Sequence, residues 1–210
     1  MMEIVKLILT AGLSYLVGSI PTAFIFGKIL KGIDIRQYGS GNVGATNAFR
    51  VLGKRWGTIV LVLDIIKGIV PVVLFAGPLS PDVPGRIVAA VAAVVGHNWT
   101  CFLGFKGGKG IATNLGVLIG LTVAIPDVRL PVALCILSWL ACFLMTAYVS
   151  LSSILAAAFL PVFMIVFGAP FLVIALSILF CFFVVLRHRP NIQRLLSGME
   201  PRVPLPFHKK

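Results

Sequence analysis

The sequence contains seven apolar runs that are candidates for membrane-spanning helices. They cover residues 4–30, 56–77, 87–103, 111–125, 130–149, 151–167 and 170–186. A crossing takes about 20 apolar residues, so the fourth run is the shortest candidate. A content of 59% hydrophobic and 11% charged residues excludes an ordinary soluble domain of 210 residues. The sequence therefore predicts an all-α integral membrane protein with one polytopic domain over residues 1–210.

The placement of Lys and Arg favours seven crossings. These residues accumulate near the cytoplasmic ends of membrane spans. With the N-terminus outside, 14 of the 18 Lys and Arg residues fall on the cytoplasmic side. Omitting the short fourth run would move the basic C-terminal tail to the opposite side. We therefore expect seven transmembrane helices and a cytoplasmic C-terminus. The net charge of +12 is explained by this placement and does not indicate nucleic acid binding.

Two features inside the apolar runs carry structural predictions. The first run is about twice the apolar length of a signal peptide, and its positive flank, Lys28 and Lys31, is at the wrong end. We expect it to remain as a membrane helix. In the second run, Asp64 and Lys67 are three residues apart, and each charge would cost roughly 2.5–3.5 kcal/mol near the membrane centre. They are predicted to form a structural pair.

Three polar segments, residues 31–55, 104–114 and 187–210, are all predicted on the cytoplasmic face, where they can build one site. The first contains GSGNVGATNAFR at residues 39–50. Glycines leave backbone N–H groups accessible to an anion, which predicts phosphate binding. The match to a dinucleotide G-x-G-x-x-G fingerprint is rejected because a membrane helix, not a strand, precedes it. The candidate ligands are Gly39, Ser40, Gly41, Asn42, Gly44, Thr46, Asn47 and Arg50. For Asn42, Thr46 and Asn47, the alternative is capping of a helix that begins near Ala45.

The second polar segment, GFKGGKG at residues 104–110, directly precedes the fourth apolar run. A helix N-terminus with unpaired N–H groups and added lysines favours phosphate. The segment is not a Walker A loop, because glycine occupies position 110 and no strand precedes it. The alternative is a flexible cytoplasmic anchor. The candidate ligands are Lys106, Gly107, Gly108, Lys109 and Thr113, together with His97, which is either a site base or a buried hydrogen-bonding residue.

The third polar segment, RHRPNIQR at residues 187–194, follows the last apolar run. It places arginines and an imidazole at the membrane interface, where they can bind an anionic substrate. Contact with anionic lipid headgroups is the alternative for Arg189, Arg194 and the terminal Lys209 and Lys210. For His188 and Asn191, the alternative is a plain surface position. The candidate ligands are His188, Arg189, Asn191 and Arg194.

These three segments resemble, in the same order, the signature segments of the PlsY family of bacterial membrane acyl-phosphate:glycerol-3-phosphate acyltransferases. The resemblance is carried by GSGNVGATN (39–47), FKGGKG (105–110) and HRPNIQR (188–194), and it extends over nearly the whole chain. It implies transfer of a fatty acyl group from acyl phosphate to the 1-hydroxyl of sn-glycerol 3-phosphate. The implied products are lysophosphatidic acid and phosphate. The implied location is the bacterial inner membrane, with the active site facing the cytoplasm.

The resemblance also implies roles for individual residues. It places Ser40, Arg50, Lys109, His188 and Asn191 at glycerol 3-phosphate, with Ser40, Lys109 and His188 as the catalytic residues. The proton acceptor stays open between His188, His97 and the substrate's own phosphate. No metal or cofactor is expected. The expected partners are the two substrates, membrane lipid and the soluble enzyme that supplies acyl phosphate.

A transporter is the alternative from another functional class. It would use the same basic, glycine-rich segments as a phosphate port. A transporter should carry polar or charged residues at matched depths in several helices, and apart from Asp64 and Lys67 these are missing. The sequence also lacks the His-x-x-x-x-Asp signature of acyl-CoA-dependent glycerol phosphate acyltransferases, which argues against that donor.

Overall fold

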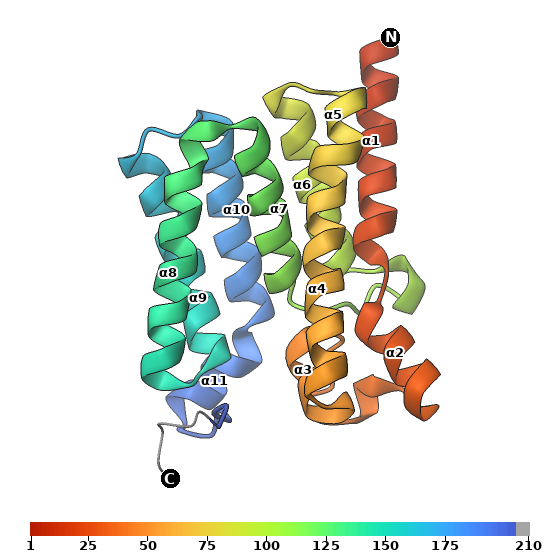
Figure 1. Ribbon diagram of the computed structural model, residues 1–210, viewed down its shortest axis with the longest axis vertical. Coiled ribbons are helices and arrows are strands. Elements are labelled where there is room, and N and C mark those ends of the chain that lie inside the picture. The colour runs from red at the N-terminus through yellow and green to blue at the C-terminus, as the bar shows by residue number, and fades with distance from the viewer. Residues whose placement is uncertain (205–210) are drawn as a thin grey trace. The chain divides into compact units, whose positions relative to one another are not determined.

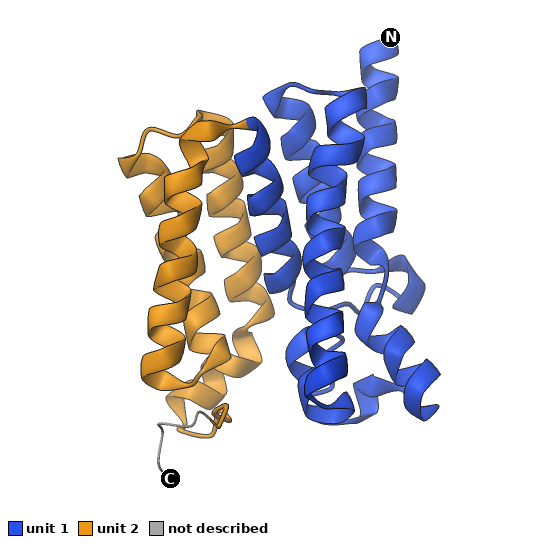
Figure 2. Ribbon diagram, in the orientation of Figure 1, with its two compact units in different colours: residues 1–124 blue, residues 125–210 orange. Residues whose placement is uncertain are grey.

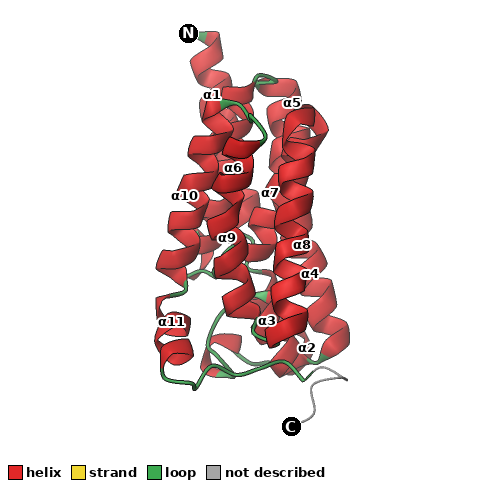
Figure 3. Ribbon diagram, turned by 90° about the vertical axis from the view of Figure 1, so that its left-hand side faces the viewer, coloured by secondary structure: helices red, strands yellow, loops and turns green. Residues whose placement is uncertain are grey.

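The computed structural model describes residues 1–204, which form helices and connecting loops without a strand (Figure 3). Lys209 and Lys210, expected at lipid headgroups, lie outside the described residues. The chain divides into two compact units, residues 1–124 and residues 125–210 (Figure 2).

Unit 1 contains the first four apolar runs and the first two polar segments. Its elements are α1 (Met2–Ser19), α2 (Thr22–Lys31), η1 (Ile35–Gln37), α3 (Ala45–Leu52), α4 (Lys54–Val70), η2 (Pro71–Phe75), α5 (Ala76–Leu79), α6 (Val83–Asn98), η3 (Cys101–Leu103) and α7 (Ile111–Ala124) (Figure 1). Helix α1 packs against α6, and α4 packs against both α7 and α3.

Glycines allow the helices of unit 1 to approach one another closely. A Cβ atom on Gly18 of α1 would overlap the main chain of Ala93 in α6. In the same way, a Cβ atom on Gly68 of α4 would overlap the Thr113 carbonyl of α7. Helices in membranes associate through such small residues, because apolar side chains gain little by leaving lipid for a helix interface. The close packing of α4 and α7 places the first turn of α7, which contains Thr113, next to the buried Gly68 of α4.

The first apolar run is helical, as predicted, but it is not one continuous helix. Helix α1 ends at Ser19, and α2 begins at Thr22, so that Ile20 and Pro21 lie between them (Figure 1). Proline lacks the backbone N–H that an α-helix needs, and its ring clashes with the preceding turn. The prediction of a single helix over residues 4–30 is corrected to two helices with a break.

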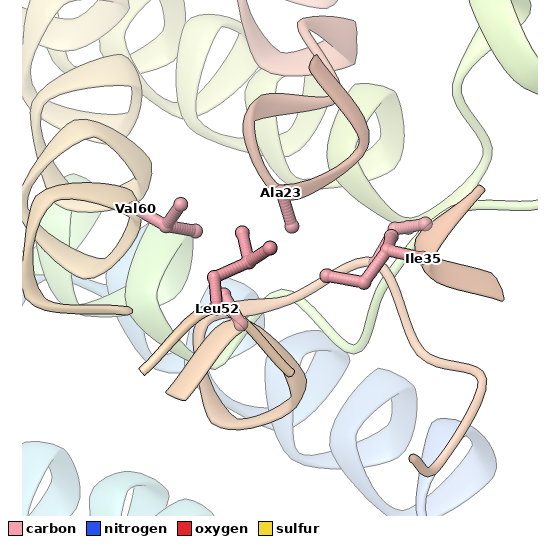
Figure 4. Packing of buried hydrophobic residues seen from close by; sticks show 6 residues of the cluster. Ala23, Ile35, Leu52 and Val60 are labelled. Carbon is pink, nitrogen blue, oxygen red and sulfur yellow. The ribbon is translucent and has the colours of Figure 1, made fainter. Parts of the chain in front are cut away.

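A small apolar cluster supports the first polar segment of unit 1. Its fully buried members Ala23, Ile35 and Val60 come from α2, η1 and α4, and Leu52 closes the cluster from the end of α3 (Figure 4). Burial of apolar surface is worth about 25 cal/mol per Å². The cluster therefore fixes η1 and α3, the two elements that flank the first glycine-rich segment.

Unit 2 contains the last three apolar runs and the third polar segment. Its described elements are η4 (Pro126–Val128), α8 (Arg129–Thr146), α9 (Val149–Val166), α10 (Phe171–Arg187) and α11 (Arg189–Leu196). Helix α9 packs against both α8 and α10. The chain bends by 62° between α10 and α11, and His188 lies at the bend.

Every apolar run predicted from the sequence is helical in the structure. Among the described residues, five helices are long and apolar enough to cross a membrane, or six if the bent pair α10 and α11 forms one span. Helix α7 has 14 residues and is shorter than these. The all-helical prediction is confirmed, whereas the number of crossings and their orientation remain predictions.

Candidate active site

The first glycine-rich segment is organised by one buried amide, that of Asn47. Asn47 Oδ1 accepts a hydrogen bond from the Ser40 backbone N–H at 2.8 Å. Asn47 Nδ2 donates to the carbonyl oxygens of Ile35 at 3.2 Å and Tyr38 at 3.0 Å. The side chain is fully buried. Asn47 therefore holds the turn from η1 into the glycines, and its polar atoms are engaged within the segment.

The glycines of this segment are required by the turn. Gly39 and Gly41 have φ angles of +61° and +71°, in the left-handed region that most residues avoid. Helix α3 begins at Ala45, as predicted, but Gly44 is the N-cap residue and no side chain caps the helix. The capping interpretation of Asn42, Thr46 and Asn47 is therefore wrong.

Two predicted ligands of this segment reach the surface. The residues Ser40 and Arg50 are exposed, whereas Asn42 and Thr46 are half-buried. Arg50 lies in the last turn of α3. A hydroxyl and a guanidinium at the surface, on a turn held by Asn47, can contact a phosphate ester, since Arg donors match the geometry of phosphate oxygens.

The second glycine-rich segment is bonded to the end of α6. The Gly107 N–H donates to the Asn98 carbonyl at 3.2 Å, and the Gly108 N–H donates to the His97 carbonyl at 3.0 Å. These two N–H groups are thus engaged by α6, and the prediction that they hold a phosphate is corrected. The two carbonyls that accept these hydrogen bonds lie in the last turn of α6, where no later residue of the helix can donate to them.

Close packing explains why glycine is needed at these positions. A Cβ atom on Gly107 would overlap the His97 carbonyl, and one on Gly108 would overlap the His97 ring. The two lysines of the segment remain accessible, because Lys106 is exposed and Lys109 is half-buried. The segment then enters α7 at Ile111. What the segment offers an anion is therefore the lysine charge at the start of a helix, where the helix dipole also favours anions.

A buried polar cluster lies behind the second segment. His97 Nδ1 lies 3.1 Å from Thr113 Oγ1 and 4.0 Å from Asp64 Oδ1. Asp64 pairs with Lys67 at 2.8 Å, which confirms the predicted ion pair. His97 and Thr113 are thus brought together, and the interpretation of His97 as a buried hydrogen-bonding residue is confirmed.

The third segment is organised by an acid that sequence reasoning did not assign to the site. Glu200 Oε1 accepts hydrogen bonds from Ser150 Oγ at 2.7 Å and from Asn191 Nδ2 at 2.6 Å. Arg194 Nε donates to Glu200 Oε2 at 2.7 Å. Burial raises the pKa of Glu200, whereas the hydrogen bonds from Ser150, Asn191 and Arg194 lower it. Together the hydrogen bonds outweigh the effect of burial, so the pKa lies below its ordinary value.

A signal for Glu200 was present in the sequence. Within residues 125–204 the acidic residues are Asp127 and Glu200, and Glu200 follows an arginine-rich segment. An acid next to these arginines is expected to form an ion pair with one of them. Its burial depends on Ser150 of α9, which is 50 positions away in the sequence and could not be assigned as a partner.

His188 is buried at the bend between α10 and α11. His188 Nδ1 lies 2.8 Å from the Val184 carbonyl oxygen. A carbonyl oxygen only accepts hydrogen bonds, so Nδ1 carries the proton, and in the neutral ring the basic lone pair is on Nε2. Arg189 of the same segment is exposed.

The fold defines a helical protein with several helices suited to a membrane, and its polar segments carry accessible cations of the kind that an anionic ligand requires. A family model described as glycerol-3-phosphate acyltransferase matches residues 8–198. A glycerol-3-phosphate acyltransferase of Desulforudis audaxviator is 46% identical, with 96% of this chain and 98% of that protein covered. Its counterpart from Fusobacterium nucleatum is 43% identical, with coverage of 90% and 93%.

Solved structures agree with these sequence matches. The chain is similar to crystal structures of PlsY, an integral membrane glycerol 3-phosphate acyltransferase. The glycerol 3-phosphate form gives a TM-score of 0.86 at 39% identity and covers 94% of this chain and 96% of that one. The lysophosphatidic acid form gives a TM-score of 0.82 at the same identity, with coverage of 94% and 95%. This chain belongs to the glycerol-3-phosphate acyltransferase family and is an integral membrane protein.

Proposed function

We propose that this protein transfers a fatty acyl group from acyl phosphate to the 1-hydroxyl of sn-glycerol 3-phosphate. The products are lysophosphatidic acid and inorganic phosphate. The observation that supports this proposal best is the similarity over 94% of the chain to a PlsY structure in its glycerol 3-phosphate form. The surface residues Ser40, Arg50 and Lys106 fit the same activity, because the acceptor and donor are both phosphate esters or anhydrides.

In the proposed reaction, oxygen O1 of glycerol 3-phosphate attacks the carbonyl carbon of the acyl phosphate. A new C–O ester bond forms, the bond from the carbonyl carbon to the bridging oxygen breaks, and phosphate leaves with the bonding electrons. Because the donor is a mixed anhydride with a good leaving group, no covalent acyl-enzyme is needed. Positioning and stabilisation of negative charge are then the main tasks of the protein.

We assign Lys109 to stabilisation of the phosphate charge that develops as the bond breaks. Arg50 and Lys106 hold substrate phosphate groups, and Ser40 donates a hydrogen bond to the glycerol phosphate. The flanking residues Gly39, Gly41, Asn42, Gly44 and Thr46 shape the first segment for this contact. Asn47 acts by holding the Ser40 backbone, which follows from its bonds within that segment.

We assign the proton acceptor role to Nε2 of His188. The contact between Nδ1 and the Val184 carbonyl favours the tautomer in which Nε2 accepts a proton. Asn191 and Arg194 are held by Glu200, and with Arg189 they are the proposed phosphate-binding residues of unit 2. Replacement of His188 by Gln should lower kcat and remove the loss of rate at low pH that protonation of this group causes, whereas an unchanged pH–rate profile would assign the proton to another acceptor.

We propose seven crossings in a bacterial inner membrane, with an outside N-terminus and the active site facing the cytoplasm. In this topology, Gly32 is cytoplasmic and Gly168 is outside. A Cβ atom at either glycine meets no neighbouring atom, and both residues have a positive φ angle, +66° and +68°, so the two cysteine variants carry a similar backbone strain. A membrane-impermeant maleimide applied to whole cells should label G168C and leave G32C unlabelled. The reverse pattern would overturn the orientation.

The test of the proposed activity is a comparison of donors. Purified protein in liposomes is given labelled glycerol 3-phosphate with either palmitoyl phosphate or palmitoyl-CoA. We expect labelled lysophosphatidic acid from palmitoyl phosphate alone. Phosphate flux across the same liposomes without product formation would support the transporter alternative and contradict the enzyme.

A further inference from the structure

The break between α1 and α2 is bound from two other parts of unit 1. Pro21 ends the helical bonding, so the Ser19 carbonyl has no donor from a continuing α1, while the Ile20 carbonyl accepts a turn hydrogen bond from the Thr22 N–H at 3.0 Å. Thr100 Oγ1 donates to the Ser19 carbonyl at 2.6 Å. Lys67 Nζ donates to the Ile20 carbonyl at 2.8 Å. In a membrane such carbonyls need a partner from the protein, and here both receive a side-chain donor.

Helix α2 is attached to the same group of residues. Thr22 begins α2, and its hydroxyl donates to Asp64 Oδ1 at 2.6 Å. The same oxygen pairs with Lys67, so one carboxylate connects the start of α2 to the lysine that binds the end of α1. Asp64 is 1% exposed and Lys67 is 6% exposed. We refer to Thr22, Asp64, Lys67 and Thr100 as the hinge cluster.

A buried ion pair is seldom retained for stability alone. Desolvation of two charges offsets much of their attraction, and a pair of apolar residues is often at least as stable. Charged residues within membrane helices more often mark function. The hinge cluster also leaves Asp64 Oδ2 buried and without a hydrogen bond among the described residues, which is not expected of a pair optimised for stability.

The hinge cluster connects the two glycine-rich segments of unit 1. From Thr22 the chain continues through α2 and η1 to Ser40, and from Thr100 it continues through η3 to Lys106 and Lys109. His97, which contacts Thr113 and carries the carbonyl bound by Gly108, lies 4.0 Å from Asp64. A displacement at the hinge cluster would therefore move the two segments relative to each other.

We propose that the hinge cluster consists of positioning residues that set the placement of Ser40 and Arg50 relative to Lys106 and Lys109. Its members act through these residues and contact no reacting atom. For catalysis, this inference rests on the proposed acyl transfer, in which both segments bind phosphate groups. Misplacement of binding groups by about 1 Å can lower a rate by about a hundredfold.

The decisive variant is the uncharged double substitution D64N/K67M. Single substitutions would leave one buried charge uncompensated, whereas the double variant keeps the side-chain volumes similar and removes both charges. The matched control is E3Q/K6M, since Glu3 and Lys6 form an exposed pair with the same three-residue spacing and the same 2.8 Å separation. We expect the control to keep the wild-type kcat and KM. For D64N/K67M we expect a fall in kcat of about ten- to a hundredfold, with a raised KM for glycerol 3-phosphate.

Two hydroxyl variants separate positioning from folding. T100V removes the donor to the Ser19 carbonyl, and T100S restores it with a smaller side chain. We expect T100V to lower kcat and T100S to recover most of it, while both variants unfold within a few degrees of the wild type. Wild-type kcat and KM in both T100V and D64N/K67M would overturn the inference.

A distance measurement tests the hinge cluster without activity. Spin labels are placed on S40C and K106C in protein whose four native cysteines are replaced by alanine. We expect one narrow distance distribution with the native hinge cluster and a shifted or broadened distribution in D64N/K67M. An identical distribution would overturn the positioning role. If the wild-type protein forms no lysophosphatidic acid, the proposed function fails, and the distance measurement still decides the inference.

Discussion

Two glycine-rich segments of unit 1, residues 39–44 and residues 104–110, look alike in sequence and differ in structure. In the first, Gly39 and Gly41 adopt positive φ angles, and the turn is bound by the amide of Asn47. In the second, Gly107 and Gly108 lie against His97 and donate their N–H groups to carbonyls at the end of α6. Glycine serves turn geometry in both segments, since Gly104 and Gly110 also have positive φ angles, +61° and +77°, and in the second segment it also allows close packing against α6. A glycine-rich pattern by itself therefore does not indicate which N–H groups are available to a ligand.

Both segments lie next to cations, Arg50 in the helix that follows the first segment and Lys106 and Lys109 within the second. Removal of one of these charges should have the largest effect on activity. Lys109→Ala should lower kcat by about a hundredfold or more, because loss of one group that stabilises developing charge typically costs 10²–10³-fold. Arg50→Ala should lower kcat/KM strongly, because Arg50 is assigned to hold a substrate phosphate group. Lys6→Ala, on the exposed start of α1, is the control and should keep wild-type activity. The measurement is the rate of lysophosphatidic acid formation. Near wild-type kcat in K109A would contradict its assigned role.

The packing of the second segment can be tested with alanine. Gly107→Ala should destabilise the protein by about 1–3 kcal/mol, because the added methyl group overlaps the His97 carbonyl. Gly12→Ala is the matched control, since a Cβ atom there meets no neighbouring atom within 4 Å. Thermal unfolding in detergent measures both. Equal stability of G107A and G12A would show that the close contact with α6 is absent.

The hydrogen bonds that hold the first segment can be tested by substitution of Asn47. Asn47→Leu removes one acceptor and two donor contacts and should cost about 1–3 kcal/mol, since buried main-chain groups lose their partners. We also expect a raised KM for glycerol 3-phosphate, because the Ser40 backbone is no longer held. Thr58→Val, at an exposed hydroxyl of α4, is the control. An unchanged KM in N47L would remove the link between this amide and the substrate.

The third segment adds a contrast, because it is organised by a carboxylate and should respond to pH. The pKa of Glu200 is lowered in the folded protein, so its stabilising contribution is present above the unfolded pKa and is lost as pH falls through the lowered value. Glu200→Gln should cost about 1 kcal/mol at neutral pH, the smallest effect predicted here. On acidification, the unfolding temperature of the wild type should fall towards that of E200Q. Parallel curves would contradict the role of the Glu200 carboxylate.

The sequence was sufficient for features that depend on neighbouring residues. The positions of the apolar helices, the start of α3 at Ala45 and the pairing of Asp64 with Lys67 were all predicted correctly. Pro21 lies inside a continuous apolar run, and hydrophobicity alone does not reveal that the helix breaks there. The carbonyls at the break are bound by Lys67 and Thr100, which come from other parts of unit 1. Gly107 and Gly108 bind carbonyls that lie 9 and 11 positions earlier, across a loop, and Glu200 is bonded by Ser150, which is 50 positions away. Such contacts require the fold, so the donors available for binding could not be derived from the motif.

The fate of one oxygen atom tests the proposed reaction most directly. Palmitoyl phosphate labelled with ¹⁸O at the bridging position is incubated with the purified protein and glycerol 3-phosphate, and both products are analysed by mass spectrometry. Attack at the carbonyl carbon predicts that all of the label appears in inorganic phosphate, in an amount equal to the lysophosphatidic acid formed. Label in free palmitate, or lysophosphatidic acid formed without an equal amount of labelled phosphate, would contradict acyl transfer from acyl phosphate.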